Sequence, residues 1–284
     1  MKECEEERTA FLSINVDNTI SIGKCCLFQE LLKVSQESIL NSNDIINTVT
    51  CLVRTVGKVN NFSSNSSACN GKKECNFTNF TLDTIKVNVN GCNLRCAMCN
   101  SEKKVGIGNF ELYFKLLEKI KGYKLKKLIL TSSGEPFLLK EQTLNYLKSL
   151  TTDDFEEVLI ITNGTNLEED DIKTLSNLNI KVTIIVSNDA ITKETYDKIR
   201  INGDFNKVFN NTLLLKKYNL LTHVNVVIQP LNVEEIPFIE DFWNKYNIKT
   251  HFVMVRGAYE EFRKNIVKNE NLKKFFEKNK EKIE

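Results

Sequence analysis

The sequence predicts an α/β fold built on a parallel sheet, and three observations lead to it. Residues 82–256 contain six short apolar runs, rich in Val, Ile and Leu and too short for independent helices. Amphipathic segments lie between the runs, so each strand is followed by a helix. The runs are nearly continuous in apolar residues, as is typical of strands covered on both faces. Six such units form either an open doubly wound sheet or a curved partial barrel, and periodicity does not choose between them.

The elements follow one another in a regular order. The expected strands are 84–89, 127–131, 158–162, 182–187, 223–229 and 250–255. The expected helices between them are 110–120, 144–150, 168–178, 206–218 and 234–246. In the first of these helices apolar residues recur at three- and four-residue spacing, and Gly122 follows its end.

The first 80 residues have a different character. A β-hairpin is expected at 11–22, where apolar and polar residues alternate on both sides of Asp17-Asn18. A helix is expected around 28–40, and residues 56–80 are rich in Asn, Ser and Gly. We therefore divide the chain into a cysteine-rich region (1–80), a strand–helix domain (81–257) and a C-terminal amphipathic helix (258–284).

Composition excludes several classes of protein. The 284 residues carry 39 Lys and Arg against 37 Asp and Glu, a net charge of +2, so we expect no nucleic-acid partner. The longest apolar runs are too short to span a bilayer, and we expect no membrane association. The first eight residues are acidic and contain no apolar stretch, which predicts no signal peptide and a cytoplasmic location.

The most informative feature is a group of three cysteines directly after the first parallel strand. Cys92, Cys96 and Cys99 have the spacing Cys-x3-Cys-x2-Cys, and the carboxyl ends of parallel strands are where ligands gather. Three thiolates on one short loop can hold three corners of a [4Fe–4S] cluster and leave the fourth iron open. The alternatives are a structural zinc site, for which no fourth Cys or His lies close in sequence, and three buried thiols without a metal.

These residues resemble the cysteine motif of the radical S-adenosylmethionine (SAM) superfamily, over about residues 82–256. The resemblance implies a (β/α)6 partial TIM-type barrel, and it implies [4Fe–4S] and SAM as cofactors. In that family the open iron chelates SAM, the reduced cluster breaks the S–C5′ bond, and a 5′-deoxyadenosyl radical removes hydrogen from a substrate.

Further segments resemble the parts of that family that bind SAM. Thr131-Ser132-Ser133-Gly134-Glu135-Pro136 is similar to its Gly-Gly-Glu-Pro segment, and a carboxylate there can accept hydrogen bonds from an ammonium group. Asn163 ends the third strand, and Ser187 and Asp189 end the fourth. Arg200 can clamp a carboxylate, or it can lie on a solvated helix face. Met98 occupies the position at which members of that family commonly have an aromatic residue near the adenine of SAM. The candidate SAM-binding residues are Met98, Ser133, Gly134, Glu135, Asn163, Ser187, Asp189 and Arg200.

A second group of cysteines surrounds the N-terminal hairpin. This arrangement resembles the auxiliary-cluster extensions called SPASM or twitch, although family members usually carry them after the barrel. The resemblance implies a second [4Fe–4S] cluster, with zinc as the alternative metal. Its candidate ligands are Cys4, Cys25 or Cys26, Cys69 and Cys75. Cys51 lies in an apolar context and is expected in the core.

We expect an oxidoreductase that oxidises, epimerises or cross-links a peptide or small-molecule substrate, with flavodoxin or ferredoxin as electron donor. The alternative is a zinc-binding interaction module without catalysis. Polar residues on late strands are candidates for the substrate side of the site: Asn225, Gln229, His251 and Arg256, with Val227 between them.

Overall fold

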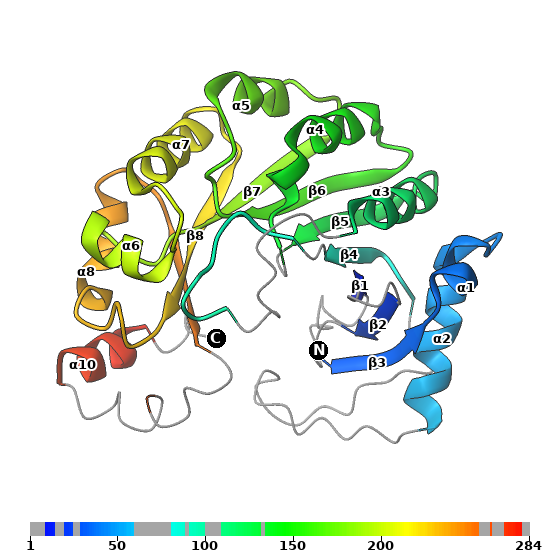
Figure 1. The fold of residues 1–284 in the computed structure, drawn as a ribbon, viewed down its shortest axis with the longest axis horizontal. Helices are drawn as coiled ribbons and strands as arrows, with labels where there is room; N and C mark the ends of the chain where they lie inside the picture. Colours follow the sequence, from blue (N-terminus) through cyan, green and yellow to red (C-terminus); the bar gives the residue numbers. More distant parts are fainter. Residues whose placement is uncertain are drawn as a thin grey trace.

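The structure is a computed structural model, and it describes residues 9–14, 20–24, 29–59, 81–88, 91–99, 109–131, 134–255, 262 and 270–279. These residues form one nine-stranded sheet in the order β3-β2-β1-β4-β5-β6-β7-β8-β9. The last six strands run parallel and curl into a half-barrel, with helices along the convex face (Figure 1). The predicted partial TIM-type barrel is therefore confirmed, and the open doubly wound sheet is excluded.

All six expected parallel strands are present, with ends shifted by at most three residues. They are β4 (Thr84–Asn88), β5 (Leu125–Thr131), β6 (Phe155–Thr162), β7 (Lys181–Ser187), β8 (Leu221–Ile228) and β9 (Thr250–Met254). The helical segments after β4 are α3 (Phe110–Lys119), η3 (Pro136–Leu139), α4 (Lys140–Ser149), α5 (Glu169–Ser176), α6 (Lys193–Ile199), α7 (Phe205–Lys217), α8 (Ile236–Asn244) and α10 (Glu270–Lys278).

The N-terminal strands continue the half-barrel's sheet. β1 (Thr9–Ile14) and β2 (Ile20–Lys24) pair antiparallel, which confirms the predicted hairpin. β1 also pairs in parallel with β4 over five residues, with Thr9 opposite Thr84 at one end and Ser13 opposite Asn88 at the other. The edge strand β4 of the half-barrel is therefore covered by backbone hydrogen bonds from the start of the chain.

The helix predicted at 28–40 is wrong over its first part. Residues Gln29–Val34 form strand β3, which pairs antiparallel with β2, and only α1 (Gln36–Leu40) is helical. The open edge of β2 offers this segment backbone hydrogen-bond partners, which outweighs its apolar spacing. Ser35 separates the two elements, because its hydroxyl caps the helix by accepting from the Ser38 N–H at 3.2 Å.

The expectation that Cys51 belongs to the core is also wrong. It lies on helix α2 (Ile45–Val59), where Ile45, Val49 and Val53 are buried and Cys51 is exposed. The three buried residues follow a four-residue period and share one face of the helix, and position 51 lies on the opposite face. The apolar residues that surround Cys51 in the sequence therefore face the core, whereas Cys51 itself faces away from it.

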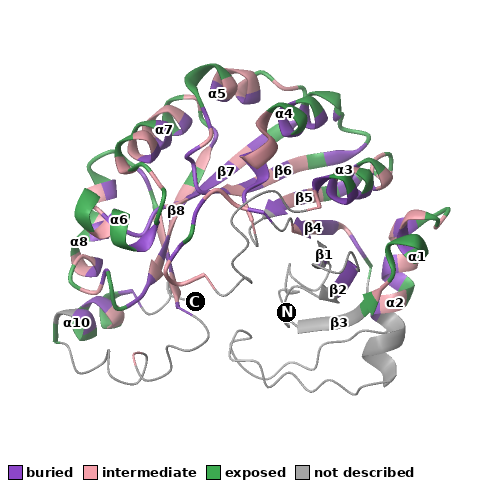
Figure 2. Cartoon of the chain, viewed as in Figure 1, coloured by how far each residue is buried: buried purple, intermediate pink, exposed green. Residues whose placement is uncertain are grey.

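The half-barrel buries one face of its strands against its helices, most regularly in β6 and β8. In β6, Val158 and Ile160 are buried under the convex layer, whereas Leu159 and Ile161 on the inner face are only half-buried. Figure 2 shows the same division, with exposed residues on the solvent side of the helices. On α10 Phe275 is buried and packs edge-on against Phe252 of β9, with ring centroids 4.8 Å apart. In the part of the chain that the structure describes, no helix combines the length and apolar character needed to cross a membrane.

Candidate functional site

The cysteine loop starts directly after β4, at the carboxyl edge of the sheet. Residues 91–99 are described, and the Glu135 N–H donates to the Gly91 carbonyl at 2.8 Å, which ties the loop's start to the end of β5. Cys96 is buried and Cys92 and Cys99 are half-buried, and none of the three forms a disulfide. The sequence motif therefore places three thiols on one loop where parallel strands present ligands.

The centre of this loop is bound to the end of α6. The Arg95 N–H donates to the Ile201 carbonyl at 3.0 Å, and the Ala97 N–H donates to the Ile199 carbonyl at 2.8 Å. Since these two residues flank Cys96, its backbone is held on both sides against the segment that carries Arg200. This contact joins residues about a hundred positions apart in the chain.

An amide network, formed by Asn93, Asn163, Thr165 and Asn166, holds the first cysteine. Asn163 Nδ2 donates to Asn93 Oδ1 at 3.0 Å, Asn93 Nδ2 donates to Thr165 Oγ1 at 2.7 Å, and Thr165 Oγ1 donates to Asn163 Oδ1 at 2.6 Å. These bonds form a closed ring in which each group both gives and receives, an arrangement that strengthens each bond. Asn163 Nδ2 also lies 3.8 Å from Cys92 Sγ.

Glu135 is 1% exposed and its carboxylate holds two strand ends together. Oε1 accepts from the Thr162 hydroxyl at 2.6 Å and the Phe137 N–H at 3.0 Å, and Oε2 accepts from the Asn163 N–H at 2.7 Å. Burial raises the pKa of Glu135, although these hydrogen bonds partly oppose it. A carboxylate has about four acceptor positions, so one remains for a further donor such as an ammonium group.

The second charged group is a buried ion pair between Asp189 and Arg200. Arg200 Nε donates to Asp189 Oδ2 at 2.7 Å, and the side chains are 8% and 0% exposed. The other oxygen, Asp189 Oδ1, accepts from the Val227 N–H at 2.7 Å. The ion pair thus joins the ends of β7, β8 and α6. Arg200 Nη1 lies 3.8 Å from Cys96 Sγ.

The thiols of the loop lie in different electrostatic surroundings. Burial raises the pKa of both Cys92 and Cys96. For Cys96 the strongest opposing influence is the positive charge of Arg200, whereas for Cys92 it is the backbone N–H of Leu94, which donates to Cys92 Sγ at 3.4 Å. A thiolate is therefore stabilised by a cation at one position and by neutral N–H groups at the other.

The donor set fits an iron–sulfur cluster better than a single ion. Among the residues that the structure describes, no three Cys, His, Asp or Glu side chains converge closely enough to hold one metal ion. A zinc site needs four ligands around one point, whereas a [4Fe–4S] cluster distributes its thiolates over separate corners of a cube. The three cysteine side chains of the loop match the distributed arrangement that a cluster requires.

The inner face of the half-barrel carries a polar group of three residues. Asn225 Oδ1 lies 3.0 Å from His223 Nε2 and 3.2 Å from His251 Nδ1, and the two imidazole rings are 5.4 Å apart. Asn225 pairs with Ser187 across β7 and β8, so this group lies level with the end of β7. Gln229, the next candidate on the substrate side, is 1% exposed beyond the end of β8.

The structure places only part of the predicted set. Met98, Gly134 and Ser187 are half-buried, and they lie at the same carboxyl edge of the sheet as Glu135, Asn163 and Asp189. Ser133 and Arg256 lie outside the described residues. The same holds for every candidate ligand of the auxiliary cluster: Cys4, Cys25, Cys26, Cys69 and Cys75.

Sequence reasoning missed the partners that hold the cysteine loop. Asn93 sits within the motif itself, and Thr162, Thr165 and Asn166 belong to the run Thr162-Asn163-Gly164-Thr165-Asn166. Such a density of hydroxyl and amide groups after a buried apolar strand is a signal that could have identified them.

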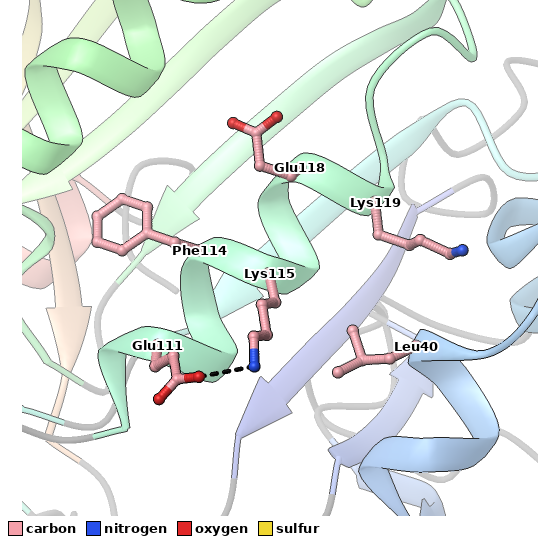
Figure 3. A pocket seen from close by; sticks show the side chains of 6 residues that line it. All are labelled: Leu40, Glu111, Phe114, Lys115, Glu118 and Lys119. Carbon is pink, nitrogen blue, oxygen red and sulfur yellow. Dashed lines mark hydrogen bonds and ion pairs between the residues drawn. The ribbon is translucent and has the colours of Figure 1, made fainter.

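A pocket of about 640 Å³ lies away from this edge. It runs along α3 beside Leu40 of α1, and Figure 3 shows its six lining residues, with the ion pair of Glu111 and Lys115 at 2.6 Å. None of the cysteines or candidate cofactor residues contributes to it, so it does not form part of the site.

Comparison with known proteins identifies a family whose matched region includes the cysteine loop. The family model of the radical SAM superfamily matches residues 89–242, more than half of the chain. A cysteine-type anaerobic sulfatase-maturating enzyme of Clostridium novyi is 28% identical over 185 residues, which cover 58% of this chain and 48% of that enzyme. An uncharacterized protein of Methanocaldococcus jannaschii is 28% identical over 187 residues, covering 63% of this chain and 58% of that protein.

The chain thus spans about half the length of these two curated relatives. Among solved structures, anSMEcpe with bound AdoMet and a Cp18Cys peptide is 21% identical, with a TM-score of 0.47, and the match covers 62% of this chain and 54% of that one.

Proposed function

Because the chain belongs to the radical SAM superfamily, we propose that it is an enzyme that splits SAM with one electron and removes a hydrogen atom from a substrate. The observation that carries this proposal is the loop with Cys92, Cys96 and Cys99, three cysteines held at the carboxyl edge of a parallel half-barrel. In our proposal these thiolates hold a [4Fe–4S] cluster. Once reduced, such a cluster would supply the electron that splits SAM into methionine and a 5′-deoxyadenosyl radical, and that radical would take the hydrogen atom from the substrate.

The surrounding residues bind and orient SAM in this proposal. Glu135 retains one acceptor position for the amino group, and Arg200 retains N–H groups for the carboxylate, since Asp189 and Cys96 occupy only two of its five. Asn163, Ser187 and Asp189, together with the backbone near Ser133 and Gly134, offer polar groups along the same edge. Met98 offers a thioether that can pack on the adenine ring.

We propose a peptide or small-molecule substrate and an oxidation, epimerisation or cross-linking reaction. The curated relative named as a sulfatase-maturating enzyme supports a peptide. Asn225, His223 and His251 offer polar groups to such a substrate on the inner face. The electron donor would be a flavodoxin or ferredoxin, and the location cytoplasmic.

We further propose that the chain has three parts: residues 1–80, the barrel (81–257) and the C-terminal helix (258–284). In this proposal residues 1–80 hold a second [4Fe–4S] cluster. The support is chemical: Cys4, Cys25 or Cys26, Cys69 and Cys75 supply the four thiolates that such a cluster takes. Iron and sulfide counts test this. The chain should hold about eight irons, falling to about four in the Cys92/Cys96/Cys99→Ala variant. About four irons in the unsubstituted chain would refute the second cluster.

The central test is reductive cleavage of SAM. The chain, purified without oxygen and reduced with dithionite, should release 5′-deoxyadenosine, and Cys96→Ala should abolish the product. Cys51→Ala is the matched control, because Cys51 is exposed on α2, outside the loop, and this variant should retain full yield. Undiminished product from Cys96→Ala would refute the proposal. Zinc in place of iron, with no absorbance near 400 nm, would instead indicate the non-catalytic module.

A further inference from the structure

The ion pair of Asp189 and Arg200 reaches the cysteine loop as well as the strand ends. Both oxygens of Asp189 accept short hydrogen bonds, at 2.7 Å from Arg200 Nε and 2.7 Å from the Val227 N–H. The carboxylate is fully buried and Arg200 is 7% exposed. The guanidinium therefore has a fixed position and little contact with water.

From this position Arg200 extends Nη1 to within 3.8 Å of Cys96 Sγ. The approach is built into the backbone on both sides, because Arg95 and Ala97, which flank Cys96, donate to the carbonyls of Ile201 and Ile199, which flank Arg200. These two backbone hydrogen bonds hold Cys96 and Arg200 side by side, which keeps the guanidinium within reach of the sulfur.

The turn that follows Arg200 is also closely packed, at Gly203 and against Tyr196. The Gly203 N–H donates to the Arg200 carbonyl at 2.8 Å, and a Cβ atom at Gly203 would lie 2.8 Å from that carbonyl oxygen and from the Tyr196 hydroxyl. Tyr196 is itself fully buried. A residue other than glycine at this position would therefore displace the turn that presents Arg200.

We propose that Arg200 is a positioning residue that donates to the Cys96 thiolate and raises the reduction potential of the cluster, an inference that rests on the proposed function. Adding an electron to a cluster increases its negative charge, and hydrogen bonds to its sulfurs together with low solvent exposure set its potential. A buried cation beside one ligand sulfur stabilises the reduced form more than an exposed cation does. This role is separate from binding SAM, since Nη2 and the second Nη1 hydrogen remain for a carboxylate.

The test is an EPR-monitored redox titration of the reconstituted chain without SAM, so that any contribution to SAM binding is absent. Arg200→Gln should lower the ratio of reduced to oxidised cluster at a fixed potential at least tenfold, a shift of about 59 mV for one electron. Arg200→Lys, which keeps the charge but cannot contact Asp189 and Cys96 in the same fork, should shift the potential in the same direction by less.

Lys198→Gln is the matched control. It removes a cation from the same helix, but Lys198 is exposed and paired with Glu194 at 2.7 Å, so the potential should not change. The Cys92/Cys96/Cys99→Ala variant supplies the signal of any second cluster, which is subtracted. The inference is overturned if the Arg200 variants retain the potential of the unsubstituted chain, or if neither holds a cluster. Absence of a cluster from the unsubstituted chain would instead refute the proposed function.

Discussion

Cys92 and Cys96 lie four residues apart on one loop, but they are held by different kinds of chemistry. The groups that stabilise a thiolate at Cys92, the amide network and the Leu94 N–H, are neutral, and the nearby Glu135 carboxylate opposes them by raising the pKa of Cys92. Cys96 faces Arg200, whose charge is balanced by Asp189. The comparison indicates a division of tasks: the neutral side fixes the position of the loop, and the charged side also sets the energy of an electron on the cluster.

The largest expected effect comes from breaking the charged side. Asp189→Asn retains an acceptor for the Val227 N–H but leaves the buried Arg200 cation uncompensated. We expect a loss of about 3–5 kcal/mol in the free energy of unfolding. Urea unfolding of the metal-free chain under reducing conditions measures it.

The double variant Asp189→Asn/Arg200→Gln is its control and should recover most of that loss, because no unpaired charge remains. Equal losses in the single and double variants would show that the charge balance is not what matters.

Crowding the turn behind Arg200 should have a smaller effect. In Gly203→Ala the new methyl group meets the Arg200 carbonyl and the Tyr196 ring and hydroxyl at 2.8 Å. Overpacking of this kind costs about 1–3 kcal/mol. Adding Tyr196→Phe removes the nearest hydroxyl and should restore part of the stability. If it restores none, the contacts with the Arg200 carbonyl and with the ring carbon that Phe retains account for the loss.

Breaking the neutral side should affect stability but not the potential. Thr165→Val removes the hydroxyl that closes the ring with Asn93 and Asn163, and we expect a loss of about 1–2 kcal/mol. Thr165→Ser keeps the hydroxyl and is the control. The reduction potential of Thr165→Val should match that of the unsubstituted chain, and a shift as large as that of Arg200→Gln would remove the distinction between the two cysteines.

The smallest expected effect lies at the opposite edge of the half-barrel. Burial raises the pKa of Glu157, but Thr183, Lys127 and Lys181 outweigh it, so the pKa is lowered overall. A lowered carboxyl pKa gives stability that is present at neutral pH and lost as the pH falls through the folded-state value. Glu157→Gln should therefore cost less than about 1 kcal/mol at neutral pH and nothing in acid, measured by urea unfolding at both.

The sequence was informative about periodic elements and about the cysteine loop, and less so about long-range contacts. The six parallel strands were predictable because fully buried strands are nearly continuous in apolar residues. Segment Gln29–Val34 was not, because a strand that completes an open edge depends on a partner that local spacing does not reveal.

The same limit applies within the site. Glu135, Asn163, Asp189 and Arg200 could be named from their motifs, but their bonds could not. That Arg200 contacts Cys96, or that Asn93 joins Asn163 and Thr165, follows only from how the loop lies across the strand ends. The exposed position of Cys51 likewise depends on the register of α2.

The parallel pairing of β1 with β4 has a practical consequence for anyone shortening this chain. A fragment that starts at residue 81 would lose β1 and leave β4 as a bare strand with unsatisfied backbone groups along one side. Strands of that kind recruit other chains, so the truncated protein is expected to aggregate even though every cysteine of the loop and every helix of the half-barrel is retained.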